Sequence, residues 1–82
     1  MKGIMCLSEL APHAAARVVR VEQSGLMARL MGLGLTKGAE VVRLFSAPGG
    51  DPTAYFLRGT TVALRKKDAD RVLVSSREDV WD

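Results

Sequence analysis

The chain has 82 residues, 48% hydrophobic and 26% charged, and this composition predicts one soluble domain with a single small core. Twelve basic and nine acidic residues give a net charge of +3, which permits an acidic partner or nucleic acid without demanding either. A single cysteine excludes an internal disulfide. No apolar run reaches the roughly 18 residues that cross a membrane, and the amino terminus lacks the regions of a signal peptide, so we expect a cytoplasmic protein.

The first part of the chain predicts a lead-in and two strands. Residues 6–10 fit one helical turn or an extended lead-in, because Pro12 bars a helix from continuing through the residue before it. The β-branched stretch in residues 15–22 predicts the first strand. After a gap, AEVVRLF in residues 39–45 predicts the second strand.

A short helix is predicted between these strands, in residues 24–34. Its apolar face consists of leucines at helical spacing, namely Leu26, Leu30 and Leu33. Gly34 suits the left-handed residue that closes a helix. Because a helix of about two turns is not stable alone, we expect it to cover the open end of a larger structure.

The second part of the chain predicts three strands joined by short connections. SAPGGDP in residues 46–52 is a loop, since proline, glycine and aspartate favour turns. Residues 53–58 and 60–65 predict the third and fourth strands. One helical turn over residues 66–70 leads to a fifth strand in residues 71–75.

Five short strands with one small helix predict a mainly β fold, a small and partly open antiparallel barrel. We expect a single domain over residues 1–75, followed by a polar C-terminal tail in residues 76–82. The helix would lie over one open end of this barrel.

Two parts of the sequence together resemble the FeoA family, small SH3-like barrel proteins associated with bacterial ferrous iron uptake. The first is RLMGLGLTKGAEVVRL in residues 29–44. The second joins APGGDP in residues 47–52 to RGTTVALRKKDADRVLV in residues 58–74. One departure is His13, where the family usually has glycine, and we expect it to alter a turn. The resemblance implies a five-stranded SH3-like barrel with one short helix.

The resemblance also implies a function, that of a non-enzymatic accessory or regulatory protein of ferrous iron transport. Its partner would be FeoB, a membrane transporter with a cytoplasmic GTP-hydrolysing part. The chain is also similar to the SH3-like domain of iron-dependent repressors, so a metal-responsive regulatory module is the alternative. The residues themselves offer neither a catalytic triad nor a P-loop, so we expect no enzyme and no required cofactor. We expect no direct membrane insertion, and a homo-oligomer stays open.

Cations near the last hairpin are the main candidates for binding a partner. They form either a solvated strand edge that discourages unwanted pairing or a docking patch for an acidic surface of the transporter. Met31 belongs either to the helix that covers the barrel or to an adaptable binding face. The candidate residues are Arg29, Met31, Lys37, Arg58, Arg65, Lys66 and Lys67.

Cys6 and His13 are the soft metal ligands of the chain. A zinc site normally needs three or four protein ligands, so zinc or iron would bind only at the surface or between two chains. Otherwise these side chains are a partly buried thiol and a surface imidazole.

The aromatic side chains indicate whether a peptide or a nucleic acid could bind. Tyr55 and Phe56 point to opposite faces of one strand, so we expect at most one in the core, and the other could line a peptide groove. Binding of nucleic acid is disfavoured, because we expect no exposed pair of aromatic side chains for base stacking.

Overall fold

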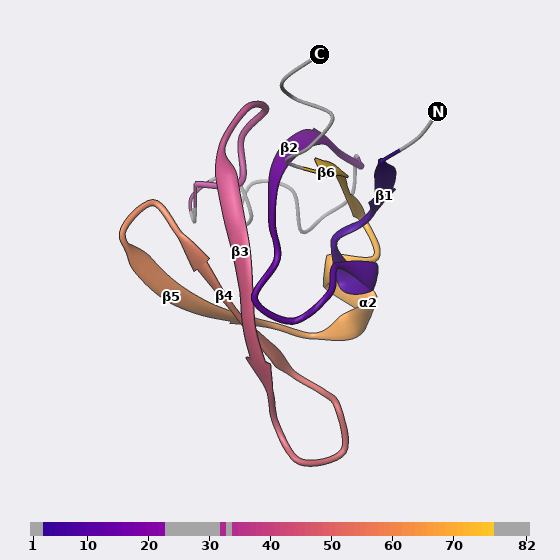
Figure 1. The fold of residues 1–82 in the computed structure, drawn as a ribbon, viewed down its shortest axis with the longest axis vertical. Coiled ribbons are helices and arrows are strands. Elements are labelled where there is room, and N and C mark those ends of the chain that lie inside the picture. Colours follow the sequence, from indigo (N-terminus) through magenta and orange to yellow (C-terminus); the bar gives the residue numbers. More distant parts are fainter. Residues whose placement is uncertain (1–2, 23–31, 33, 77–82) are drawn as a thin grey trace.

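The computed structural model describes residues 3–22, 32 and 34–76, and their backbone forms mostly strands. Figure 1 shows these elements in chain order. They are β1 (Ile4–Cys6), the 3₁₀ helix η1 (Leu7–Glu9), β2 (Ala15–Val21), β3 (Glu40–Ser46), β4 (Thr53–Leu57), β5 (Thr60–Leu64), α2 (Lys66–Ala69) and β6 (Val72–Ser76). No helix in this described part of the chain is long and apolar enough to cross a membrane.

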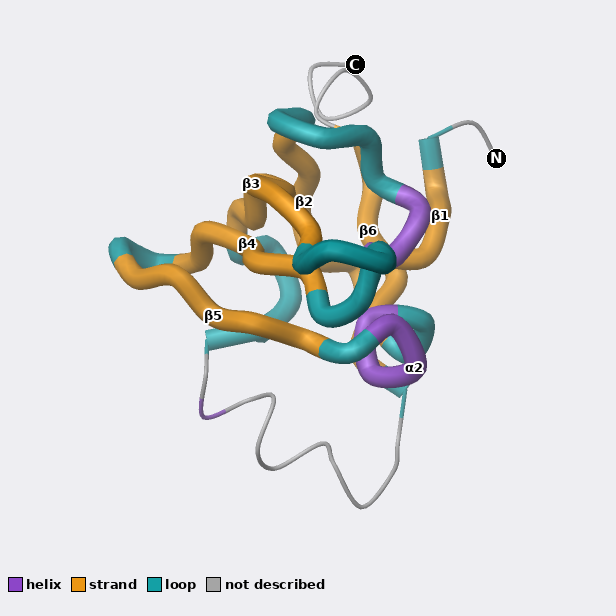
Figure 2. Tube along the Cα trace, turned by 90° about the horizontal axis from the view of Figure 1, so that it is seen from below, coloured by secondary structure: helices purple, strands orange, loops and turns teal. Residues whose placement is uncertain are grey.

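The strands form one antiparallel sheet in the order β1-β6-β2-β3-β4-β5. The sheet curls, and α2 at the end of β5 packs against η1, so the two ends of the sheet approach each other (Figure 2). The hairpin that joins β3 to β4 projects beyond the rest of the barrel (Figure 1).

The predicted mainly β fold is confirmed, and the described part of the chain contains one strand more than the five expected. The additional strand is β1, which pairs with β6 through Ile4↔Ser75 and Cys6↔Leu73. Its three residues carry no strong strand signal, so pairing with β6 rather than local propensity makes them a strand. The predicted helical turn over residues 66–70 corresponds to α2.

The predicted helix in residues 24–34 falls almost entirely outside the described residues, and its place over an open end therefore stays a prediction. Gly34, at the expected end of this helix, has a φ of 97°. This is the left-handed conformation that commonly closes a helix. The predicted tail begins within β6, which extends to Ser76, and its other residues are not described.

A change of register in β3 decides which of its side chains face the core. Val42 lies opposite Phe56 and Arg43 opposite Tyr55, but the next pair is Phe45 with Ala54, so Leu44 is an extra residue. Strict alternation would have put Phe45 on the inner face with Val41, because side chains along a strand alternate between faces. The extra residue turns Phe45 to the outer face instead.

On the inner face, the same change of register supports a polar network. Ser46 lies opposite Thr53, and their hydroxyl oxygens are 2.7 Å apart. The Arg43 guanidinium donates to Ser46 Oγ at 3.1 Å and to the Leu10 carbonyl at 2.6 Å. Arg43 therefore ties the segment before β2 to the β3–β4 hairpin.

The core is one cluster of apolar side chains. It receives residues from η1, from α2 and from every strand of the sheet except β1, whose Met5 packs against its rim. Its largest fully buried members are Tyr55, Leu7, Leu35, Leu57, Val18, Val41, Val72 and Val74. Residues from both ends of the described chain thus share one core.

Neighbouring positions on β4 test this assignment of faces. Leu57 has no exposed surface, whereas Phe56 is 44% exposed on the opposite face. We expect Leu57→Ala to lower the free energy of unfolding by about 2–5 kcal/mol, because it leaves a cavity in the core. We expect Phe56→Ala to lower it by about 1 kcal/mol or less. Urea unfolding measures both, and equal losses would contradict the assignment.

Candidate partner-docking surface

The structure distributes the predicted cations over two ends of β5. Arg58 lies in the tight turn between β4 and β5, while Arg65, Lys66 and Lys67 follow the other end of β5. A five-residue strand separates the two groups by about 17 Å. The described cations therefore do not form a continuous patch around one hairpin. Arg29 and Met31 lie outside the described residues.

Arg58 and Lys37 belong to turns that precede or join strands. Arg58 has a φ of 51°, and its aliphatic stem lies against Gly34, where an added Cβ would stand 2.5 Å from Arg58 Cδ. Gly34 thus leaves room for the arginine stem. Lys37 is exposed in the turn that precedes β3.

At the other end of β5, Lys66 already has acidic partners. Its Nζ lies 3.3 Å from Asp70 Oδ2, and its backbone N–H donates to Asp51 Oδ1 at 3.0 Å. Arg65 and Lys67 are exposed, and neither forms an ion pair with a described acidic residue. Of these three side chains, Arg65 and Lys67 therefore offer their charge to a partner more fully.

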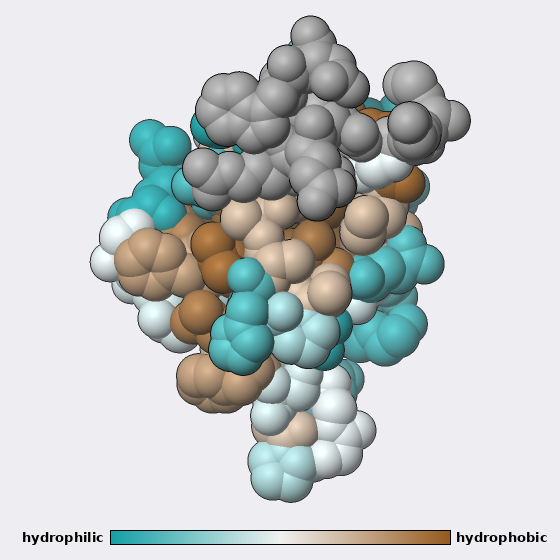
Figure 3. Space-filling view, viewed as in Figure 1, coloured by the Kyte–Doolittle hydropathy of each residue, from teal (hydrophilic) through white to brown (hydrophobic). Residues whose placement is uncertain are grey.

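Between the two groups of cations, the outer face of β3, β4 and β5 exposes apolar side chains, which Figure 3 shows gathered over these strands. Phe45 is 67% exposed and Phe56 is 44% exposed. We call this surface the aromatic face, and by strand register it consists of Val42, Phe45, Ala54, Phe56, Thr61 and Ala63.

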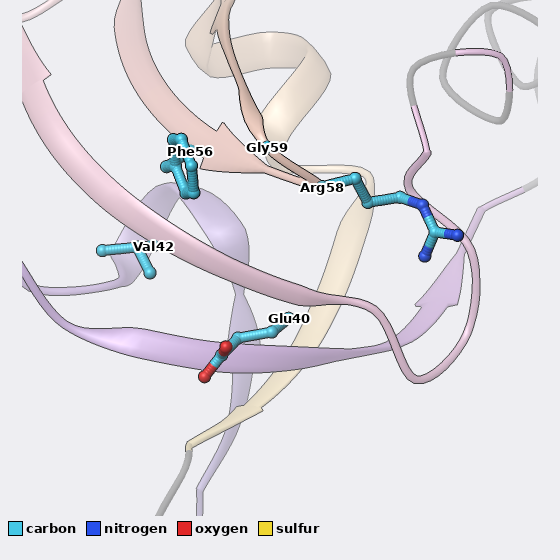
Figure 4. A pocket seen from close by; sticks show the side chains of 5 residues that line it. All are labelled: Glu40, Val42, Phe56, Arg58 and Gly59. Carbon is cyan, nitrogen blue, oxygen red and sulfur yellow. The ribbon is translucent and has the colours of Figure 1, made fainter.

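One end of the aromatic face is hollowed. A groove of about 240 Å³ is lined by Glu40, Val42, Phe56, Arg58 and Gly59. Figure 4 shows Val42 and Phe56 projecting from neighbouring strands on the same side of the sheet, while the guanidinium of Arg58 extends away from them. The groove therefore has apolar walls and charged groups at its rim.

The sequence predicted only part of the aromatic face. The expectation for Tyr55 and Phe56 is confirmed, since Tyr55 is buried and Phe56 is exposed. The expectation that no exposed aromatic pair exists is wrong, because Phe45 joins Phe56 on the outer face. Alternation along the sequence would have buried Phe45, and no local signal marks Leu44 as an extra residue.

The predicted metal ligands Cys6 and His13 lie at the end of β1 and in the turn before β2. Burial is the main cause that raises the pKa of the Cys6 thiol, and the carboxylates of Glu9, Asp70 and Glu22 add to it. His13 is exposed, in a turn whose backbone N–H donates to the Arg43 carbonyl at 2.7 Å. Within residues 3–22 and 34–76, no group of three or more histidine, cysteine, aspartate or glutamate residues could hold a metal ion.

Asp70 links α2 to η1. The Ser8 hydroxyl donates to Asp70 Oδ1, and this hydrogen bond is the main cause that lowers the pKa of the Asp70 carboxyl, with Lys66 as a further cause. This contact joins the end of the sheet at β5 to the segment after β1.

A family model described as "FeoA domain" matches residues 5–76. A search of curated protein sequences gives no significant match. Among solved structures, iron(II) transport protein A from Clostridium thermocellum is 37% identical, with a TM-score of 0.85. That match covers 90% of this chain, but this chain spans only 46% of that protein.

Two further solved structures have a fold similar to that of this chain. FeoA from Stenotrophomonas maltophilia complexed with zinc is 38% identical, with a TM-score of 0.79, and the match covers 87% of this chain and 89% of that one. It is described as an SH3 domain protein, which agrees with the expected SH3-like barrel. IdeR from T. acidophilum has a TM-score of 0.79 over 93% of this chain and 35% of its own, but at 18% identity it shares the fold alone.

The link between Ser8 and Asp70 gives a prediction for pH dependence. Ser8→Ala should raise the pKa of Asp70 toward its usual value, because the carboxylate loses its hydroxyl donor. A lowered pKa in the folded state stabilises the protein above the unfolded-state pKa, and this stabilisation is lost as the pH falls through the folded-state value. The wild type should therefore unfold less readily than Ser8→Ala at neutral pH, and the difference should shrink in acid. NMR titration of Asp70 and urea unfolding at several pH values measure both effects, and an unchanged Asp70 pKa would contradict the assignment.

Proposed function

Because the chain belongs to the FeoA family of ferrous iron transport accessory proteins, we propose that it docks on the cytoplasmic, GTPase-containing part of a FeoB-type transporter. The observation that carries this proposal is the FeoA domain match over residues 5–76. A 38% identical relative, FeoA from S. maltophilia, is described as a candidate activating factor of bacterial ferrous iron transport. The chain would regulate the transporter without catalysis of its own.

The chemistry of the described residues supports a binding role. Among residues 3–22, 32 and 34–76, the buried side chains belong to hydrophobic residues, Tyr55 included, apart from Thr53, whose hydroxyl lies within hydrogen-bond distance of Ser46 Oγ. The titratable groups with shifted pKa values are a partly buried thiol, a buried phenol and an exposed carboxylate. These groups do not form a nucleophile with an adjacent base, so a docking protein suits them better than an enzyme.

Exposed cations would orient the encounter with an acidic partner. Charge at an interface chiefly affects the rate of association and the choice of partner. Arg58, Arg65 and Lys67, together with Lys37, would contribute most, and Lys66 less because of its ion pair with Asp70. On this proposal the protein acts in the cytoplasm and requires no cofactor of its own.

The alternative, a metal-responsive regulatory module, gains less support. The likeness to IdeR concerns the fold alone, and Cys6 and His13 do not complete a metal site within the described residues. The zinc complex of the S. maltophilia relative describes that protein and does not assign a metal site to this chain. The accessory role in ferrous iron transport is therefore the function that we retain.

A charge-reversal pair tests the proposed docking. Lys67→Glu should slow association with the purified cytoplasmic part of the transporter by about tenfold or more at low salt, because it repels an acidic surface. Arg20→Glu is the matched control, since Arg20 is an exposed cation on β2, which β3 and β4 separate from β5 in the sheet. Surface plasmon resonance at two salt concentrations measures the rates. If the wild type does not bind, the proposed docking is wrong. If both variants lower the association rate equally, only the role of Lys67 is wrong.

A further inference from the structure

We propose that the aromatic face binds a partner segment that presents an aliphatic side chain flanked by carboxylates. This inference deepens the proposed function, on which the choice of the transporter as the partner rests. It assigns the docking contact to the outer face of β3, β4 and β5 rather than to the cations alone.

The aromatic face has two large apolar side chains on either side of small ones. Phe45 lies opposite Ala54, and Phe56 lies two residues further along β4 on the same side. Ala54 is only 8% exposed although it faces outward, so larger side chains around it cover it. Two phenylalanines thus flank a floor made of small residues, Ala54 and its neighbour Ala63.

The size of the adjoining groove limits what could fill it. Pockets for small-molecule ligands usually measure about 300–1,000 Å³. The groove beside Phe56 measures about 240 Å³ and is open on the sheet surface. It therefore suits one or two protein side chains better than a cofactor.

A contiguous apolar surface of this kind indicates an interaction site. Single exposed apolar residues are normal on proteins, but adjoining ones on neighbouring strands commonly mark a binding surface. Val42 and Phe56 are direct cross-strand neighbours, and Phe45 follows them across the change of register. The extra residue Leu44 brings Phe45 to this surface.

Charge complementarity selects the partner. The stem of Arg58 lines the groove at one end of the aromatic face, and its guanidinium extends beyond that end. Arg65 has extended backbone and is the next outward position after Ala63 at the other end. A second copy of this chain would bring arginines toward arginines in either orientation, whereas a segment with carboxylates on both sides of its apolar residue would meet both cations.

A nucleic acid is the less suitable occupant of this surface. Exposed phenylalanines and arginines also occur where single strands bind. However, Ala54 and Ala63 line the floor of the aromatic face with methyl groups, which offer nothing to the hydrogen-bonding edges of bases. The acidic, aliphatic protein segment is therefore our choice.

The test compares the two exposed phenylalanines on β3 and β4 with an exposed isoleucine on the edge strand β1. Phe56→Ala and Phe45→Ala should each raise the Kd for the cytoplasmic part of the transporter by at least about tenfold, because each removes an apolar anchor. Ile4→Ala is the control, since Ile4 is 36% exposed on β1, the opposite edge from β5. It should leave the Kd within about twofold of the wild-type value. If both phenylalanine variants bind like the wild type, the proposed surface is wrong.

A peptide probe separates this outcome from a failure of the proposed function. The ¹⁵N-labelled chain is titrated with an acetylated twelve-residue peptide of leucine pairs separated by glutamates, with a control in which lysines replace the glutamates. Amide shifts of β3 and β4 with the acidic peptide alone support the surface even if the transporter does not bind, in which case only the proposed partner is wrong. No shifts there, equal shifts with both peptides, or tighter phenylalanine-dependent binding of a single-stranded oligothymidylate would overturn the inference.

Discussion

The extra residue in β3 is the constraint on which both sides of the barrel depend. Up to the pair Arg43↔Tyr55, β3 and β4 alternate as a regular hairpin, and beyond it the register shifts by one residue. The inner face then receives Ser46, which Arg43 and Thr53 contact, rather than Phe45. The Arg43 guanidinium also contacts the Leu10 carbonyl, so the same region holds the chain before β2 in place. One local irregularity thus places a hydrogen-bonded serine on the inner face and an exposed phenylalanine on the outer face.

The sequence predicts those parts of the fold that local chemistry determines. β-branched stretches bounded by turn residues indicated β2 to β6, and Pro, Gly and Asp in residues 46–52 indicated the β3–β4 loop. β1 was missed because its three residues become a strand only through β6. The exposed pair of Phe45 and Phe56 was not predicted because alternation is a local rule, whereas the change of register follows from pairing with β4. Arg58 and Arg65 were grouped because they are close in sequence, but an extended strand places them far apart.

The turn at His13 has a backbone conformation that is uncommon for a residue other than glycine. The FeoA resemblance places glycine at this position, and His13 has a φ of 68°, in the left-handed region that glycine adopts most readily. The His13 backbone N–H still donates to the Arg43 carbonyl at 2.7 Å, so the turn is held against β3. His13 thus adopts a backbone conformation that glycine favours, and the turn is anchored to β3. The candidate docking surface lies elsewhere, on the outer face of β3, β4 and β5, and does not depend on this turn.

Photo-crosslinking in cells that contain the transporter tests the central claim, docking through the aromatic face, most directly. The photoreactive amino acid p-benzoylphenylalanine would replace Thr61, which is exposed directly opposite Phe56, and in a separate variant Arg20 on β2. Our account predicts that irradiation joins the chain to the transporter's cytoplasmic part from position 61 and not from position 20. Crosslinking from position 20 without any from position 61 would contradict it.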